Sequence, residues 1–192
     1  MKLWARARPI PFLIAIGLFC GVTSLAFPFP AFALPSISAG QIELIPVGAV
    51  LAILPAMIWA WSASRSRILR EWQSHRGATV ALLDLGSAAL PLGIVLPFAL
   101  VSETAAGTLL VALPAMAITI FLFAVRPAWA PAAAPTYVAF VMLFGHSDAS
   151  ERPLPWAWSV TLQPDLVEWG ASVFAFVLAV AIAANSARTR NS

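Results

Sequence analysis

The stretch TVALLDLGSAALPLGIVLPFALV, residues 79–101, decides the class of fold, because Asp84 is its only charged residue. A helix needs roughly 20 predominantly apolar residues to cross a bilayer, since the hydrocarbon core is about 30 Å thick and each residue adds about 1.5 Å. This stretch is long enough to do so. It therefore predicts a transmembrane helix.

The composition of the whole chain agrees with this prediction. Of the 192 residues, 61% are apolar and 10% are charged, whereas a soluble domain has about 25% charged residues. The chain has too little charge to coat a water-facing surface. A disordered chain is excluded as well, because disorder goes with low hydrophobicity and high net charge. Composition therefore favours a membrane protein.

The same length criterion finds six candidate spans. The fifth begins with alanines and prolines, so an interfacial or re-entrant segment is the alternative there. The predicted fold is all-α, with six transmembrane helices in a single transmembrane domain, residues 1–192. The approximate bounds of the spans are 9–27, 44–62, 79–101, 106–125, 129–145 and 166–185.

The first span is followed by Ala31-Phe32-Ala33, which fits the A-x-A pattern of a signal-peptide cleavage site. The apolar run is longer than the core of a typical signal peptide. We therefore interpret it as an uncleaved span, which extends at most toward Leu34, because the prolines around position 30 break or kink a helix.

The basic residues predict the orientation of the spans, because Lys and Arg near span ends are retained in the cytoplasm. Ten of the eleven basic residues fall on one side of a six-span chain, and only Arg152 falls on the other. Both termini are therefore predicted to be cytoplasmic. The ten are Lys2, Arg6, Arg8, Arg65, Arg67, Arg70, Arg76, Arg126, Arg188 and Arg190.

The tryptophans agree with these span ends. All eight lie at or beyond a predicted span end, as expected of aromatic belts among the lipid headgroups, with Trp59, Trp61 and Trp129 in the inner belt. One lysine against ten arginines, with many alanines and prolines, is typical of a GC-rich bacterial coding sequence. We therefore expect the bacterial cell membrane as the location and its lipids as partners.

The segment 62–78, SASRSRILREWQSHRGA, is the most informative predicted cytoplasmic loop. If it is helical, Ile68 and Trp72 fall on one apolar stripe, whereas Arg70 and Glu71 fall on a polar face. Such a helix lies on anionic headgroups or docks onto a cytoplasmic protein and transmits motion to the spans. Both interpretations remain open at this point.

The segment 146–165 is the longest predicted outer loop, and prolines punctuate it. Leu154, Trp156 and Trp158 alternate there with smaller or polar residues. A re-entrant segment that dips into the outer leaflet or caps a cavity is one interpretation. A surface loop that its tryptophans anchor at the headgroups is the other.

Asp84 is the only carboxylate inside a predicted span. An intramembrane acid is a functional hypothesis by default, but Asp84 lies only about two helical turns from Arg76. A structural pairing of these two residues is the favoured interpretation. One titratable group is also too few for proton-coupled transport, which needs a chain of them.

Small residues at four-residue spacing let helices approach closely. Gly17 and Gly21 have this spacing in the first span, and Gly86 and Gly93 are a second pair of small residues in the third. They predict contact faces between helices, without naming the helix that packs there.

No catalytic, cofactor or metal site is predicted. The sequence has no G-x-x-x-x-G-K-S/T motif for ATP, no H-E-x-x-H motif and no G-x-S-x-G motif. His75 and His146 are predicted on opposite sides of the membrane, so they cannot share a metal. The basic residues follow the topology and form no groove for nucleic acid. An enzyme and a nucleic-acid partner are therefore not expected.

The layout resembles the ABC-2-type permease family of ATP-driven exporters. Members of this family have six spans with both ends inside, a coupling helix after the second span, and short re-entrant helices before the last. Arg70-Glu71, followed by RGATVALL at 76–83, is similar to a degenerate version of the charged cluster, Gly-Thr and aliphatic run of that family.

The resemblance implies a permease subunit that exports an amphipathic or hydrophobic cargo, such as a lipid, an antibiotic or a peptide. Its partners would be cytoplasmic ATPase subunits and a second permease chain, identical or different. The segment 146–165 would be the re-entrant part. The residues that couple to the ATPase would be Arg67, Ile68, Arg70, Glu71, Trp72 and Arg76.

Two other functions remain open. A six-span substrate-capture subunit of a vitamin-type importer would hold a polar ligand near the outside, with Trp156, Trp158, Glu103 or Asp148 as candidate contacts. An accessory subunit of a larger membrane complex would have no chemistry of its own.

Overall fold

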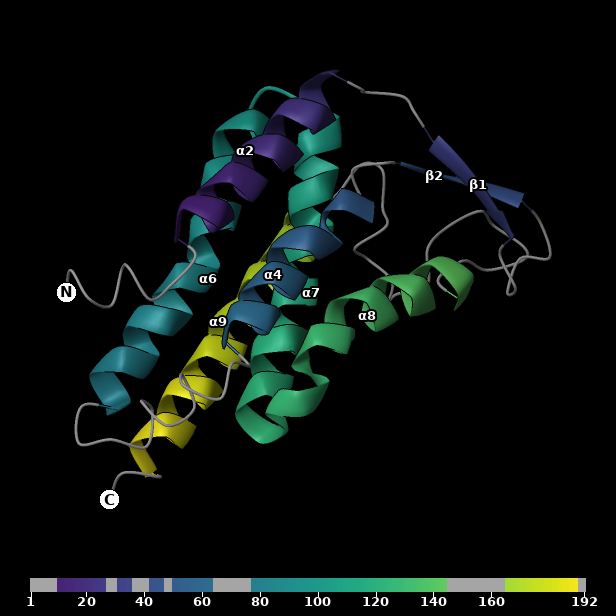
Figure 1. Ribbon diagram of the computed structural model, residues 1–192. Helices are drawn as coiled ribbons and strands as arrows, with labels where there is room; N and C mark the ends of the chain where they lie inside the picture. The colour runs from purple at the N-terminus through teal and green to yellow at the C-terminus, as the bar shows by residue number, and fades with distance from the viewer. Residues whose placement is uncertain are drawn as a thin grey trace.

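The structure is a computed structural model, and it describes residues 10–26, 31–35, 42–46, 50–63, 77–144 and 165–189. Within these ranges the chain is helical except for one β-hairpin and the connecting turns (Figure 1). The elements are α2 (Ile10–Ala26), β1 (Ala31–Pro35), β2 (Ile42–Pro46), α4 (Ile53–Ala63), α6 (Gly77–Ala99), α7 (Glu103–Val125), η1 (Pro127–Trp129), α8 (Ala130–Phe144) and α9 (Leu166–Thr189).

Four helical stretches are long and apolar enough to cross a membrane, and they confirm the predicted helical membrane character. They are Thr79–Ala99, Glu103–Val125, Pro127–Phe144 and Leu166–Ala187. The third of them shows that the Ala- and Pro-rich start of the predicted fifth span is helical. Helices α2, with 17 residues, and α4, with 11 residues, are apolar but shorter.

The predicted second span, 44–62, is wrong at its beginning. Residues 44–46 lie in β2, which pairs antiparallel with β1 in a register from Ala31 opposite Pro46 to Pro35 opposite Ile42. The extension of the first span toward Leu34 is wrong for the same reason. A short apolar run suits a strand as well as a helix, and the two prolines stand at strand ends, where the missing N–H is tolerated.

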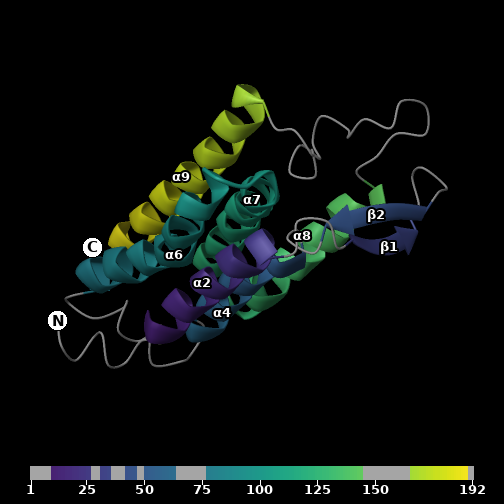
Figure 2. The same ribbon diagram turned by 90° about the horizontal axis from the view of Figure 1, so that it is seen from above.

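The hairpin lies apart from the helices, beyond the carboxyl end of α8, in both ribbon views (Figures 1 and 2). The helices themselves run alternately in opposite directions. As a result, the start of α2 and the end of α9 lie at the same end of the bundle (Figure 2).

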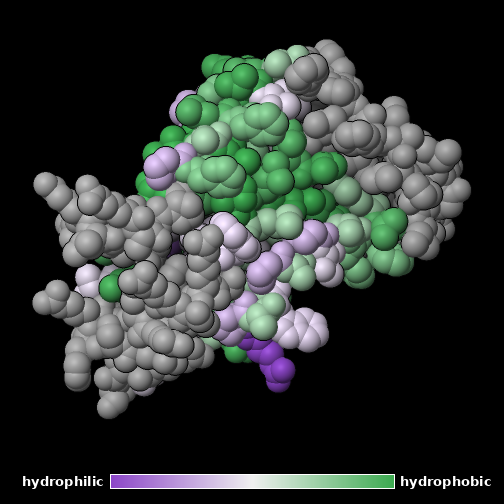
Figure 3. Space-filling model, viewed as in Figure 1, coloured by the Kyte–Doolittle hydropathy of each residue, from purple (hydrophilic) through white to green (hydrophobic). Residues whose placement is uncertain are grey.

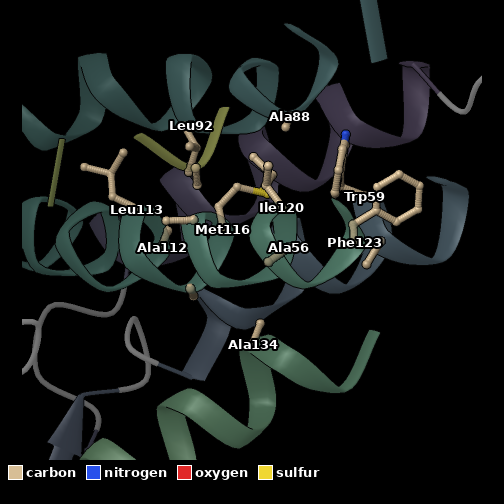
Figure 4. Packing of buried hydrophobic residues seen from close by; sticks show 14 of the residues in the cluster. Ala56, Trp59, Ala88, Leu92, Ala112, Leu113, Met116, Ile120, Phe123 and Ala134 are labelled. Atoms are coloured by element: carbon tan, nitrogen blue, oxygen red, sulfur yellow. The ribbon is translucent and has the colours of Figure 1, made fainter. Parts of the chain in front are cut away.

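Helix α7 forms the centre of the bundle. It contacts α2, α4, α6, α8 and α9, and every residue from Thr108 to Ala117 is buried. Its sequence is apolar on all sides, which is the pattern of a helix surrounded by protein. Met116, Ile120 and Phe123 are three of its large buried side chains, and they lie in the core between α4 and α6 (Figure 4).

Helix α9 packs against α7 and α6 through small residues. Ala179, Ala183 and Ala187 are buried at four-residue intervals, a spacing that lets two helices approach closely. On the opposite face, Phe174 and Val177 are exposed. Other helices also expose large apolar side chains, and apolar surface covers much of one side of the molecule (Figure 3). Such a surface suits contact with lipid rather than water.

Candidate functional site

The residues predicted to couple to an ATPase lie outside the part of the chain that the structure describes, as does the outer segment with Leu154, Trp156 and Trp158. The structure does place the two ends of the coupling segment. Ala63 ends α4 and Gly77 begins α6. The predicted coupling residues therefore lie in the sequence between the end of α4 and the start of α6.

Asp84 is a residue of α6 with 3% of its surface exposed. Its backbone carbonyl accepts a hydrogen bond from the Trp59 Nε1–H at 3.0 Å and one from the Ser87 hydroxyl at 2.6 Å. Arg76, its predicted partner, lies outside the described residues. The Trp59 and Ser87 side chains and the Asp84 carbonyl form a buried polar cluster, which we call the Trp59 cluster, and its Trp59 bond ties α4 to α6.

Trp59 is therefore not part of an aromatic belt, and this prediction is wrong. Only 1% of its surface is exposed, and its ring packs edge-on against Phe123 of α7, with the ring centres 5.5 Å apart and an interplanar angle of 71° (Figure 4). Trp61 and Trp129, in contrast, are 55% and 65% exposed, as a belt position requires. Trp59 in the core and Trp61 on the surface are therefore only two residues apart in the sequence.

A second polar contact joins α2 to the residues just before α4. The Cys20 thiol donates to the Leu51 carbonyl at an Sγ to oxygen distance of 3.6 Å. Pro55 stands four residues after Leu51 and has no N–H to donate to that carbonyl. Cys20 is buried, and its thiol gives the Leu51 carbonyl a partner.

The third polar contact joins α2 to α7. The hydroxyl oxygens of Ser24 and Thr108 are 3.0 Å apart and buried. Each hydroxyl also lies within hydrogen-bond distance of a carbonyl one turn earlier in its own helix, Cys20 at 2.7 Å and Thr104 at 2.9 Å. Two hydroxyl protons face three contacts, so one contact lacks a proton at any time, and two of the three possible patterns include the bond between Ser24 and Thr108. Sequence reasoning missed it, although hydroxyl residues in apolar helices are a known signal.

The glycines of α2 lie against α6. An ideal Cβ at Gly17 would stand 3.0 Å from the backbone of Pro91, and one at Gly21 would stand 2.5 Å from the ring of Phe98. Gly86 and Gly93 differ, because a Cβ at either position meets no atom of the described chain within 4 Å. The prediction that these two form a contact face is therefore wrong within the described part.

The charged residues at the helix ends separate by sign. Glu103, Asp165 and Glu168 lie where α7 and α9 begin, whereas Arg126 lies at the opposite end, where α7 ends. Asp165 and Glu168 also cap α9 reciprocally: the Glu168 N–H donates to Asp165 Oδ1 at 2.9 Å, and the Asp165 N–H donates to Glu168 Oε2 at 3.1 Å.

Among the described residues, no three His, Cys, Asp or Glu side chains are grouped closely enough to hold a metal ion. Three of the described polar contacts instead join different segments of the bundle: Trp59 to Asp84, Cys20 to Leu51, and Ser24 to Thr108. Comparison with known proteins finds no matching family, no matching curated protein and no matching solved structure.

Proposed function

We propose that the chain is a membrane-spanning permease subunit of an ABC-2-type exporter in the bacterial cell membrane, powered by separate ATPase subunits. The observation that carries the proposal is the arrangement of the helices. A helix lies in each of the six stretches that the sequence marks as apolar, although the one in the second stretch begins only at Ile53. Successive helices alternate in direction, and α2 begins at the end of the bundle where α9 finishes (Figure 2).

The charges support a cytoplasmic location for this end of the bundle. Arg126 and the exposed Trp129 follow α7 there, and the three carboxylates of the helix starts lie at the other end. Arginine is retained on the cytoplasmic side, and exposed tryptophan rings sit among headgroups. Ala63, where α4 ends, and Gly77, where α6 begins, lie at the same end, and we propose that the segment between them in the sequence contacts the cytoplasmic partner.

Helix α4 is the shortest of the six helices in the proposed bundle. Its 11 residues extend about 16 Å, roughly half of the hydrocarbon core. Residues 50 and 51, just before it, are helical as well.

The proposed cargo follows from the scarcity of charge. Away from the helix ends, Asp84 is the only charged side chain in the described helices, and the carbonyl of the same residue lies in the Trp59 cluster. A strongly charged cargo that crossed the membrane along these helices would find almost no side chain of opposite charge. A lipid, an amphipathic antibiotic or a hydrophobic peptide fits it.

Purification of the chain in mild detergent from its native host tests the proposal. Recovery of an ATPase and a second six-span chain in stoichiometric amounts is the expected result. A tightly bound vitamin in their absence would contradict it in favour of substrate capture. Recovery of neither would contradict it in favour of an accessory role.

A further inference from the structure

The two halves of α6 are attached differently to α4 and α2, in addition to the contacts that α6 makes with α7 and α9. Its first half is tied to α4, because the Trp59 Nε1–H donates to the Asp84 carbonyl at 3.0 Å. Its second half is packed against α2, where Gly17 and Gly21 bring the backbone of α2 against Pro91 and Phe98. The two attachments are made to different helices and lie on either side of Ser87.

The helix is weakest between these attachments. Pro91 has no N–H, so the Ser87 carbonyl lacks its helical donor. The Ser87 hydroxyl, in turn, donates to the Asp84 carbonyl at 2.6 Å, and a side-chain bond back to the preceding turn bends a helix. A proline together with such a bond is a recognised cause of a kink.

The outward side of α6 leaves room for bending. Gly86 is exposed next to Ser87, and Gly93 is exposed just after Pro91. Neither position has another described atom within 4 Å of an ideal Cβ. At these two positions, therefore, no described side chain restricts bending of the helix toward that side.

From these contacts we infer that α6 is a hinged helix, which bends between Ser87 and Pro91. The half from Gly77 to Asp84 moves together with α4, and the half from Pro91 to Ala99 moves together with α2. A displacement of the end of α4 at Ala63 would then rotate α4 and the first half of α6 as one body. The inference concerns the helices alone, so it does not depend on whether an ATPase is the partner.

The hinge can be measured with two spin labels on the exposed side of α6. Leu82→Cys and Leu96→Cys, 46% and 49% exposed in the native chain, are labelled in a Cys20→Ser background in liposomes, and the distribution of distances between the labels is recorded. A hinged helix gives a broad or two-peaked distribution. Pro91→Ala supplies the missing N–H, and it is expected to narrow the distribution about twofold.

Pro135→Ala is the matched control, because it makes the same change inside a helix, α8, that carries neither label. It is expected to leave the width unchanged. Equal widths in the native chain and in Pro91→Ala would overturn the hinge. If Pro91→Ala does not fold, the distance distribution in the native chain tests the hinge by itself. A straight helix of fourteen residues is about 21 Å long, so one narrow peak near that distance would also overturn the hinge.

A second label pair tests the attachment to α4. Spin labels are placed at Met57→Cys on α4 and Leu82→Cys on α6, and the distance between them is measured. Trp59→Phe removes the N–H donor and keeps an aromatic ring, and it is expected to broaden the distribution of this distance. Trp61→Phe is the matched control, since Trp61 is 55% exposed. An unchanged distribution in Trp59→Phe would show that α4 and the first half of α6 are not coupled through this hydrogen bond.

Discussion

At Gly17 the backbone of α2 meets the backbone of α6. An added methyl group would lie 3.0 Å from both the Cα and the carbonyl oxygen of Pro91, and a backbone cannot swing aside as a side chain can. We expect Gly17→Ala to lower the free energy of unfolding by about 1–3 kcal/mol through overpacking. Thermal unfolding of the purified chain in detergent measures this.

Gly86→Ala is the matched control for that substitution. It makes the same chemical change inside a helix, where alanine is intrinsically favoured over glycine, but its methyl group enters open space among the described residues. Its stability should equal or exceed that of the native chain. Equal losses in both variants would mean that the contact between α2 and α6 does not depend on the absence of a side chain at Gly17.

A second prediction at the residue scale concerns the start of α9. Asp165 and Glu168 each accept a hydrogen bond from the backbone N–H of the other, which forms a capping box. Asp165→Ala removes one acceptor and should weaken the first turn by about 1 kcal/mol. Hydrogen exchange of the first-turn amides should then be about fivefold faster, whereas Asp165→Ser should exchange nearly as slowly as the native chain.

Among the elements, α6, α7 and α9 could be predicted from the sequence because an apolar run of their length has few alternatives to a helix. Helix α4 and the hairpin were predicted less accurately. A hydropathy window over residues 44–62 averages a strand and a helix that are both apolar, and it does not detect the change of period between them. The strand Ala31–Pro35 was missed for the same reason, because its apolar residues were interpreted as a possible extension of the first span.

The candidate site shows the same limit. Gly17 and Gly21 have a spacing that marks a contact face, but only the structure names α6 as the partner. Trp59 and Trp61 have the same local sequence signal, yet one is in the core and the other on the surface. Burial is a property of the neighbouring helices, here Phe123 of α7 and the Asp84 carbonyl of α6, and no single span contains that information.

The prediction at the scale of an element concerns the segment between α4 and α6. Glu71→Ala combined with Trp72→Ala removes one charged and one aromatic side chain from the proposed docking face. We expect cargo-stimulated ATP hydrolysis by the reconstituted complex to fall severalfold, while basal hydrolysis by the ATPase persists. Trp129→Ala, an exposed tryptophan at the same end of the bundle, should not have this effect. Unchanged stimulation in the double variant would contradict the proposed coupling role.

For the whole molecule, burial decreases from the centre of the bundle outward. The apolar stretch of α7 is 78% buried within the chain, and that of α9 is 17% buried, although both are equally unsuited to water. The difference is explained if α9 completes its burial in lipid or against another chain. A bundle of this kind has an inside and an outside end, which sets up a test of its orientation.

The orientation can be tested with single cysteines in a Cys20→Ser background. Leu100 and Leu166, 80% and 90% exposed, lie at the end with the carboxylates, and Trp129, 65% exposed, lies at the end with Arg126. Because arginine is retained in the cytoplasm, a membrane-impermeant maleimide added to intact cells should label Leu100→Cys and Leu166→Cys. It should label Trp129→Cys only after the membrane is permeabilised. The reverse pattern would contradict the assigned direction, and labelling of all three in intact cells would contradict the placement of the two ends on opposite sides of a membrane.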